Sequence, residues 1–171
     1  KETSHASRTE LPPTILERFA IIPDVHHPEA HRDYRVMLRA LNIFQPEGLL
    51  VLGDFADAAS LSAHAKTEKG ADDFKAEIDA VNAELDILDR LPGLKWKKYI
   101  EGNHEYRLQR YLANNAQALM GVLDIKGCLN LIERGWEFTP YMQHTNIGKV
   151  HFTHDTGTAG MNAHRNARDI F

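Results

Sequence analysis

The sequence predicts an α/β domain with a parallel sheet in its first half, and two observations lead to this prediction. Three short apolar runs of the kind found in buried parallel strands alternate with segments whose apolar residues recur at helical spacing. From residue 135 the pattern changes to shorter alternating runs separated by turn residues, which is typical of hairpins. We expect one domain over residues 14–171, preceded by a polar arm over residues 1–13.

The first half of the chain is expected to alternate strand and helix. The run RFAIIPD (18–24) predicts the first strand, and GLLVLGD (48–54) predicts the second. The segment 28–44 between them is expected to be a helix, because its apolar residues share one helical face. These residues are Tyr34, Met37, Leu38 and Leu41. Residues 58–70 are expected to form helix and loop at the surface.

The clearest helix is predicted over residues 72–93. Acidic residues occupy its first turn and a Pro-Gly pair ends it, as the helix dipole and the missing N–H of proline require. Its apolar stripe consists of Phe74, Ile78, Val81, Leu85 and Leu88. The spacing of this stripe predicts a helix that packs one face on the sheet.

The rest of the chain is expected to supply one more parallel strand and then a hairpin. The run LKWKKYIEGN (94–103) predicts the third strand, and the helix after it carries Leu108, Leu112 and Leu119. The stretches WEFTPYMQH, TNIG and KVHFTHD (136–155) predict a β-hairpin with TNIG as its turn.

Composition and charge exclude several classes of protein. The chain has 171 residues, 43% of them hydrophobic, which is enough for one globular core. Lys and Arg total 20 against 24 Asp and Glu, and the net charge of −4 disfavours a broad nucleic-acid footprint. The single cysteine, Cys128, excludes an internal disulfide framework and a cysteine-rich zinc module. Because no apolar run reaches membrane-spanning length, we expect a cytoplasmic protein without membrane attachment.

Side chains that could bind metal follow each predicted strand. In an open α/β sheet, ligands bind in the crevice beyond the carboxyl ends of the strands. At these ends the sequence places carboxylate, imidazole and amide groups: Asp24, His26, Asp54, Asp57, Asn103, His104 and His154. We expect the sheet to bring these loops together into one site.

These ligand types indicate two divalent metal ions. Carboxylate, imidazole and amide oxygen without thiolate suit Mn, Fe, Zn, Ni or Co, and of these we favour Mn. A carboxylate such as Asp54 can bridge two ions about 3.5–4 Å apart, as in two-metal phosphoesterases. Such a pair holds a bridging water or hydroxide that attacks phosphorus, while a nearby imidazole protonates the leaving alkoxide.

The motifs DVH, GD, GNHE and TH resemble, in order and spacing, those of the calcineurin-like metallophosphoesterase family. The resemblance extends from about Phe19 to Arg168 and is strongest to bacterial and phage phosphoesterases related to Mre11-type nucleases. Each motif alone is weak, but four in the right order at strand ends are specific. The resemblance implies a four-layer α/β/β/α sandwich.

The resemblance also implies which residues would bind each metal ion. Asp24 and His26 would hold the first ion, and Asp54 would bridge the two ions. Asn103 and His154 would hold the second ion. All five of these ligand residues are present in this chain, which argues against a non-catalytic scaffold that has lost its metals.

Further roles follow for the residues around these ligands. His104 would be the catalytic residue, because it would orient the phosphate or protonate the leaving group. Asp57, the second acid of the family's GDxxD pattern, would steady its neighbourhood. Glu105 would cap the next helix or hold a ligand in place, and Arg107 and His27 are candidates for substrate contact.

The sequence departs from the family pattern in two places. The family completes its site with a GHxH stretch that gives one histidine to each metal, and this stretch is absent. The final residues, GTAGMNAHRNARDIF (157–171), resemble the segment before it, so we expect a fold truncated before its last strands. Asp155 stands where many relatives have glycine, and it could ligate a metal, repel phosphate or form a hydrogen bond.

We therefore expect a binuclear metal-dependent phosphoesterase. Its partner would be a phosphate ester, with a phosphodiester favoured and a nucleic acid or nucleotide as candidates. The alternatives are a phosphomonoesterase or nucleotidase on the same site, and a non-catalytic scaffold. An uncovered sheet edge would also permit a homo-oligomer.

Overall fold

The computed structural model describes residues 16–62 and 73–155. Four parallel strands form one sheet in the order β1 (Phe19–Ile22), β2 (Gly48–Leu52), β3 (Trp96–Ile100) and β4 (Glu137–Thr139). Two further strands, β5 (Thr145–Ile147) and β6 (Val150–Phe152), form an antiparallel hairpin. The polar arm at residues 1–13, most of the predicted surface segment 58–70 and the final stretch 157–171 lie outside the described residues.

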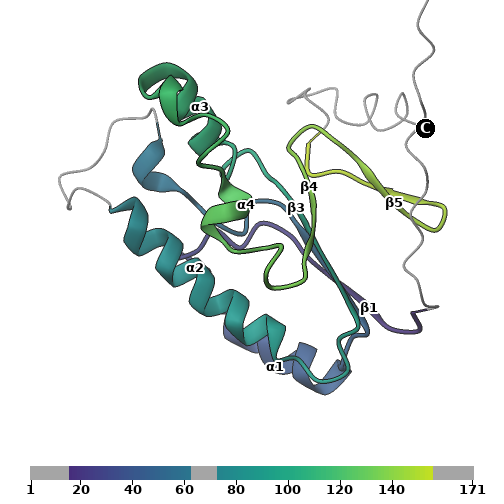
Figure 1. Ribbon diagram of the computed structural model, residues 1–171. Coiled ribbons are helices and arrows are strands. Elements are labelled where there is room, and N and C mark those ends of the chain that lie inside the picture. The colour runs from purple at the N-terminus through teal and green to yellow at the C-terminus, as the bar shows by residue number, and fades with distance from the viewer. Residues whose placement is uncertain (1–15, 63–72, 156–171) are drawn as a thin grey trace, which may run out of the picture.

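The helices lie on one face of the sheet and the hairpin lies on the other (Figure 1). Helices α1 (Tyr34–Phe44) and α2 (Phe74–Asp89) cover the first face. Helix α3 (Arg107–Asn115) lies at the carboxyl-terminal end of the strands, and the single turn α4 (Ile125–Cys128) follows it. The 3-10 turns are η1 (Ala59–Leu61) and η2 (Gln117–Leu119). The predicted α/β fold with a parallel sheet is therefore confirmed.

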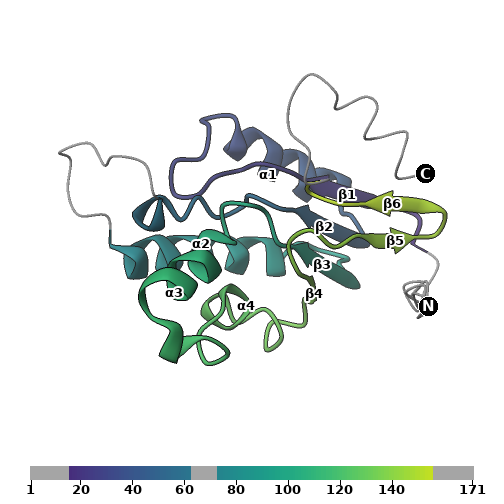
Figure 2. The ribbon, with the colours of Figure 1, turned by 90° about the horizontal axis from the view of Figure 1, so that it is seen from above.

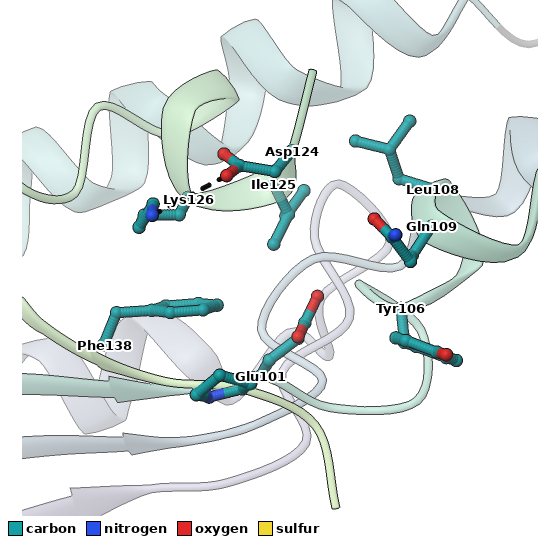
Figure 3. A pocket seen from close by; sticks show the side chains of 9 residues that line it. Glu101, Tyr106, Leu108, Gln109, Asp124, Ile125, Lys126 and Phe138 are labelled. Carbon is teal, nitrogen blue, oxygen red and sulfur yellow. Dashed lines mark ion pairs between the residues drawn. The ribbon is translucent and has the colours of Figure 1, made fainter. Parts of the chain in front are cut away.

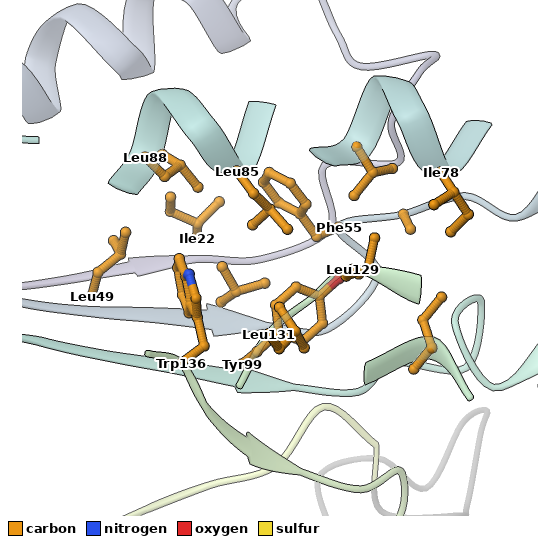
Figure 4. Close-up of a cluster of buried hydrophobic side chains, with 14 of the residues drawn as sticks. Ile22, Leu49, Phe55, Ile78, Leu85, Leu88, Tyr99, Leu129, Leu131 and Trp136 are labelled. Atoms are coloured by element: carbon orange, nitrogen blue, oxygen red, sulfur yellow. The ribbon is translucent and has the colours of Figure 1, made fainter. Parts of the chain in front are cut away.

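The core lies between the sheet and α2 (Figure 4). Leu85 and Leu88 of α2 are fully buried against the strands, as the sequence predicted from the stripe they belong to. On the sheet, Tyr99 packs with Trp136, and their ring centroids are 6.3 Å apart. Asp73 caps α2 by accepting a hydrogen bond from the backbone N–H of Lys75, which fixes where this helix begins.

The expected hairpin over residues 136–155 is wrong in its first strand and in its turn. Residues Glu137–Thr139 join the parallel sheet beside β3, because the buried Trp136 anchors this segment to the core. Residues Thr145–Ile147, expected as the turn, form β5 instead. The turn lies at Gly148, whose φ of +61° is the left-handed conformation that glycine adopts without strain.

The helix after β3 is shorter than predicted. It ends at Asn115, and Leu119 lies in η2 with 47% of its surface exposed, so the expectation that this helix carries Leu119 is wrong. The side chain of Asn115 bonds to the carbonyl of Tyr111, and that of Gln117 bonds to the carbonyl of Ala113. These side chains satisfy the last carbonyls of the helix and favour its termination.

The hairpin lies alongside β1 when the molecule is viewed from above (Figure 2). The rings of Phe19 on β1 and Phe152 on β6 have centroids 6.4 Å apart. This packing carries the residues after β6 toward the carboxyl ends of the parallel strands. None of the helices in the described ranges is both long and apolar enough to span a bilayer.

Candidate metal centre

The loops after β1 and β2 run side by side beyond the ends of their strands. The backbone N–H of Asp24 donates to Gly53 O at 3.2 Å, and that of His26 donates to Asp54 O at 2.9 Å. The backbone N–H of Asp57 then donates to His27 O at 2.8 Å. The strand pairing is thus continued into the loops, and the two loops present their side chains to one region.

Three of the predicted ligands have a left-handed backbone. The φ angles are 50° at Asp24, 57° at His26 and 50° at Asp54. Residues other than glycine occupy this region at a cost of about 1–3 kcal/mol each, and such residues cluster at functional sites. The surrounding hydrogen bonds must therefore hold these loops in a shape that the isolated chain would not favour.

Two glycines allow these loops to approach one another closely. A Cβ atom on Gly102 would lie 2.1 Å from Asp54 Oδ1, and a Cβ atom on Gly53 would lie 2.3 Å from His154 Nδ1. Gly53 also has a φ of +79°. The glycines of the GD and GNHE motifs are therefore spacers that leave room for ligand side chains.

The carboxylate of Glu105 connects the loops after β2 and β3 by hydrogen bonds. The residue is fully buried, and its carboxylate accepts five hydrogen bonds. The donors are the backbone N–H groups of Asp54, Phe55, Ala56 and Gly102 and the hydroxyl of Tyr99. Burial raises the pKa of Glu105, while these donors oppose that shift. The expectation that Glu105 holds a ligand in place agrees with these contacts, which fix the backbone of Asp54.

The carboxylates and imidazoles form two adjacent groups. In each group the candidate ligand atoms lie within 4.8 Å of one another. The first group consists of Asp24, Asp54 and His154, and the second consists of His26, Asp57 and His104. The rings of His26 and His104 meet edge to face, with centroids 4.5 Å apart. Each group offers the carboxylate and imidazole ligands that a divalent transition metal accepts.

Asp54 belongs to the first group and also contacts His104 of the second group. Its Oδ1 accepts the backbone N–H of His104 at 2.9 Å. Its Oδ2 lies 3.4 Å from His154 Nε2 and 3.8 Å from His104 Nε2. Burial alone would raise the pKa of Asp54, but the hydrogen bonds from His154 and His104 hold it below its usual value. A carboxylate in this position can serve both groups.

Contacts at both ring nitrogens fix the orientation of His154. Its Nδ1 donates to the carbonyl oxygen of Leu52 at 2.8 Å, which turns Nε2 toward Asp54 and toward Asn103 Oδ1, 3.1 Å away. The hydrogen bond to Asp54 raises the pKa of His154 to about 9. In the metal-free protein, the proton on Nε2 of His154 therefore lies between this nitrogen and the oxygen atoms of Asp54 and Asn103. A metal ion could replace this proton, so the residues fit a metal ion.

His104 forms a chain of contacts with Asp57 and Arg107. Its Nδ1 lies 2.6 Å from Asp57 Oδ1, and its Nε2 lies 3.0 Å from a guanidinium nitrogen of Arg107. Arg107 also donates to the backbone carbonyl of Asp57 at 2.8 Å. Since the guanidinium can only donate, Nε2 accepts and Nδ1 carries the proton. This series of contacts joins the loop after β2 to the start of α3.

The structure brings most of the predicted site residues together and places a few elsewhere than expected. His26 belongs to the donor group with Asp57 and His104, and Asp24 belongs to the donor group with Asp54 and His154. His27, expected near the substrate, is 4% exposed and packs its ring against those of Tyr34 and Phe55. Burial lowers the pKa of His27 to about 4, so its ring is a neutral part of the core.

The tyrosines near the site were missed by the sequence reasoning. The hydroxyl of Tyr141 donates to Asp155 Oδ2 at 2.7 Å, so Asp155 accepts a hydrogen bond in this structure. Burial and Asp155 raise the pKa of Tyr141 to about 12. The hydrogen bond from the Tyr99 hydroxyl to Glu105 was also missed, because it depends on which face of β3 carries Tyr99 and on how the loop after β3 folds back. No local signal in the sequence marks either tyrosine.

The comparisons with known proteins agree with this geometry. The sequence matches the family model of the calcineurin-like phosphoesterases over residues 17–166. Comparison with curated proteins and with solved structures gives no significant match. The family match spans most of the chain and every residue of both donor groups. The chain therefore belongs to the calcineurin-like phosphoesterase family, a family of metal-dependent phosphoesterases.

Proposed function

We propose that this protein is a binuclear metal-dependent phosphoesterase that favours phosphodiesters. The observation that carries the proposal is the pair of donor groups, with Asp54 of the first group in contact with His104 of the second. Two ions about 3.5–4 Å apart are the usual apparatus for in-line displacement at phosphorus. The proposed metal is Mn²⁺, with Fe, Zn, Ni and Co as alternatives of similar ligand preference.

The proposed ligands are distributed over both ions. Asp24 and His26 would hold the first ion, Asn103 and His154 the second, and Asp54 both. When bound, the two ions supply Lewis-acid activation of water and neutralise charge on the phosphate. The hydrogen bond from His154 Nδ1 to Leu52 supports this assignment, because it leaves Nε2 directed at Asp54 and Asn103.

His104 is proposed to protonate the leaving alkoxide. Asp57 accepts a hydrogen bond from the N–H of Nδ1, and its carboxylate would stabilise the imidazolium that forms when Nε2 is also protonated. Arg107, which donates to Nε2 without substrate, offers the same guanidinium to a phosphate oxygen. In this proposal the phosphate displaces Nε2 from Arg107 and leaves the imidazole facing the leaving group.

Two features support a small phosphodiester over other substrates. The motif series DVH, GD, GNHE and TH resembles that of the branch related to Mre11-type nucleases. The net charge of −4 disfavours tight binding of long duplex DNA, since such binding depends on neutralising many phosphates. A phosphomonoester or nucleotide on the same site is the alternative.

The test is hydrolysis by the full-length protein after it is stripped with chelator and reloaded with Mn²⁺. We expect turnover of bis-(p-nitrophenyl) phosphate to exceed that of p-nitrophenyl phosphate. His104→Ala should lower kcat by about 10²-fold or more, the scale of a lost general acid. His31→Ala is the matched control, because its side chain is 73% exposed at the surface.

The result also decides between enzyme and scaffold. Turnover of the monoester alone would replace the diester preference with phosphomonoesterase activity. No turnover of either ester with Mn²⁺, Ni²⁺, Co²⁺ or Zn²⁺ would reject the enzyme and favour a non-catalytic scaffold.

A further inference from the structure

A pocket of about 280 Å³ is lined by residues of the loop after β3, of α3 and α4, and of β4 (Figure 3). Its floor is apolar and includes Ile125 and Leu108, both 3% exposed. The rings of Phe138 and Tyr106 form walls, and the carboxylate of Glu101 points into the space between them. Apolar walls with few convergent polar groups are the usual lining of a small-molecule site.

The pocket and the metal centre share one loop. Glu101 and Tyr106 line the pocket, and they flank Asn103 and His104, which face the metal centre. The ring of Tyr106 packs on that of Tyr141 with centroids 4.9 Å apart. A ligand with its phosphate at the metal centre could therefore extend its organic group past this tyrosine pair into the pocket.

Glu101 is an acceptor that the protein leaves partly unused. The residue is 8% exposed, and in the described part of the chain only the backbone N–H of Tyr141 donates to its carboxylate, at 2.9 Å to Oε2. The other carboxylate oxygen has no hydrogen bond within the described residues and is not a fully buried atom, so it can accept a hydrogen bond from a ligand. Burial also raises the pKa of Glu101.

The other acid of the pocket is already satisfied. Asp124 Oδ1 accepts the backbone N–H of Gly127, and its Oδ2 lies 3.7 Å from Lys126 Nζ. The uncompensated acceptor is therefore Glu101, and the amide of Gln109 at the rim can donate or accept. The pocket thus offers the acceptors of Glu101 and Gln109 together with the flat rings of Phe138 and Tyr106.

We propose that this pocket binds the organic group of the substrate, and that this group is a nucleobase whose N–H donors bond to Glu101. The inference rests on the proposed phosphoesterase function and names the substrate class of the same site. Aromatic and apolar walls suit a planar heterocycle, since ring faces stack on Phe138 and Tyr106. The volume of about 280 Å³ is near the lower end of ligand pockets, which suits one base with its phosphate held outside.

The test is binding of a phosphate-free nucleoside, so that it does not depend on metal or turnover. Guanosine is the probe, because its ring N–H and amino group lie side by side and can donate together to a carboxylate. The metal-free, ¹⁵N-labelled protein is titrated by NMR. We expect shifts at the backbone amides of Gln109, Ile125 and Phe138, and saturation that gives a Kd.

Two variants separate the pocket from its surroundings. Glu101→Gln retains an oxygen for the Tyr141 N–H but turns an amide NH₂ into the pocket, and it should weaken guanosine binding about tenfold. Gln109→Trp fills the pocket from the half-buried rim of α3 without altering the core, and it should abolish binding. The matched controls are Glu133→Gln and Asn114→Trp, both at exposed positions outside the pocket, which should leave the Kd unchanged.

The outcomes reject this inference and the phosphoesterase proposal separately. If guanosine causes no shifts, or if Gln109→Trp binds it as tightly as the wild type, the nucleobase pocket is rejected. If ethanolamine phosphate shifts the pocket amides and guanosine does not, the pocket takes an amine and the inference is likewise overturned. Guanosine binding by a protein that hydrolyses no ester with any metal would retain the pocket and reject the phosphoesterase.

Discussion

Glu105 holds the backbone of Asp54 although the two residues are 51 positions apart in the sequence. Its Oε2 accepts the N–H of Asp54 at 3.0 Å and also that of Gly102 at 3.0 Å. The carboxylate thus joins the loop after β2 to the loop after β3 at their closest approach. Glu105 has no proposed contact with substrate, but it fixes the position of the Asp54 carboxylate, which is proposed to bridge the two metals.

The first prediction concerns this carboxylate. Glu105→Gln places an amide NH₂ among groups that only donate, so at least one buried N–H loses its acceptor. We expect the free energy of unfolding to fall by about 3 kcal/mol, measured by urea denaturation. Glu133→Gln, at an exposed position, should change it by less than about 0.5 kcal/mol. An equal loss in the two variants would show that Glu105 is not the link between the loops.

The second prediction concerns the spacing of the loops. In Gly102→Ala the new Cβ would meet Asp54 Oδ1 at 2.1 Å, so the carboxylate must move. We expect the affinity for Mn²⁺, measured by calorimetry, to fall by about 10–100-fold, as when groups that orient ligands are lost. Gly127→Ala is the control, because its Cβ would meet only the Asp124 side chain at 3.1 Å. Unchanged affinity in Gly102→Ala would place the metal away from Asp54.

The third prediction concerns the proton on His154 in the metal-free protein. The pKa of His154 is raised from 6.5 to about 9 in the folded state, mainly by Asp54. Its contribution to stability is therefore complete below pH 6.5 and is lost as the pH rises through about 9. We expect the free energy of unfolding to fall by about 3 kcal/mol across this range, measured by urea denaturation with chelator present.

Two comparisons test the origin of that slope. His154→Gln should remove most of it, while His144→Ala, at an exposed position, should leave it intact. Saturating Mn²⁺ should also remove it, because the metal takes the place of the proton. A slope that persists in His154→Gln would assign it to other groups.

The fourth prediction separates two roles for Asp57. If Asp57 acts by holding the Nδ1 proton of His104, Asp57→Asn should lower kcat by about 10²-fold and leave two ions bound. If it is a ligand, as its position in the second donor group allows, the bound metal measured by mass spectrometry should fall. We expect the first result. Asp33→Asn, whose parent side chain is 71% exposed, is the control.

The sequence predicts the parallel sheet and the position of the site because both depend on local pattern. Apolar runs identify β1, β2 and β3, and parallel strands necessarily bring their carboxyl ends to one edge. Polar residues that follow these runs, such as Asp24, Asp54 and Asn103, are then neighbours regardless of the exact conformation of the loops. That much requires no knowledge of distant contacts.

The remaining features depend on contacts that no local pattern records. The segment with β4 alternates like a hairpin strand, and only the burial of Trp136 against Tyr99 decides that it joins the parallel sheet. The five donors around Glu105 come from residues up to 51 positions away. The grouping of His26 with Asp57 and His104 likewise depends on how the loops after β1 and β2 pair.

The left-handed backbone at Asp24, His26 and Asp54 has a consequence for the evolution of this protein. Glycine at Asp24 or His26 would relieve strain and raise the melting temperature while removing a proposed metal ligand, whereas glycine at Asp54 would also lose the stabilising contact with His154. A population selected for thermal tolerance alone should therefore accumulate glycine at positions 24 and 26 and lose the proposed hydrolysis as it gains stability. Heat resistance and the proposed catalysis thus make opposite demands on positions 24 and 26.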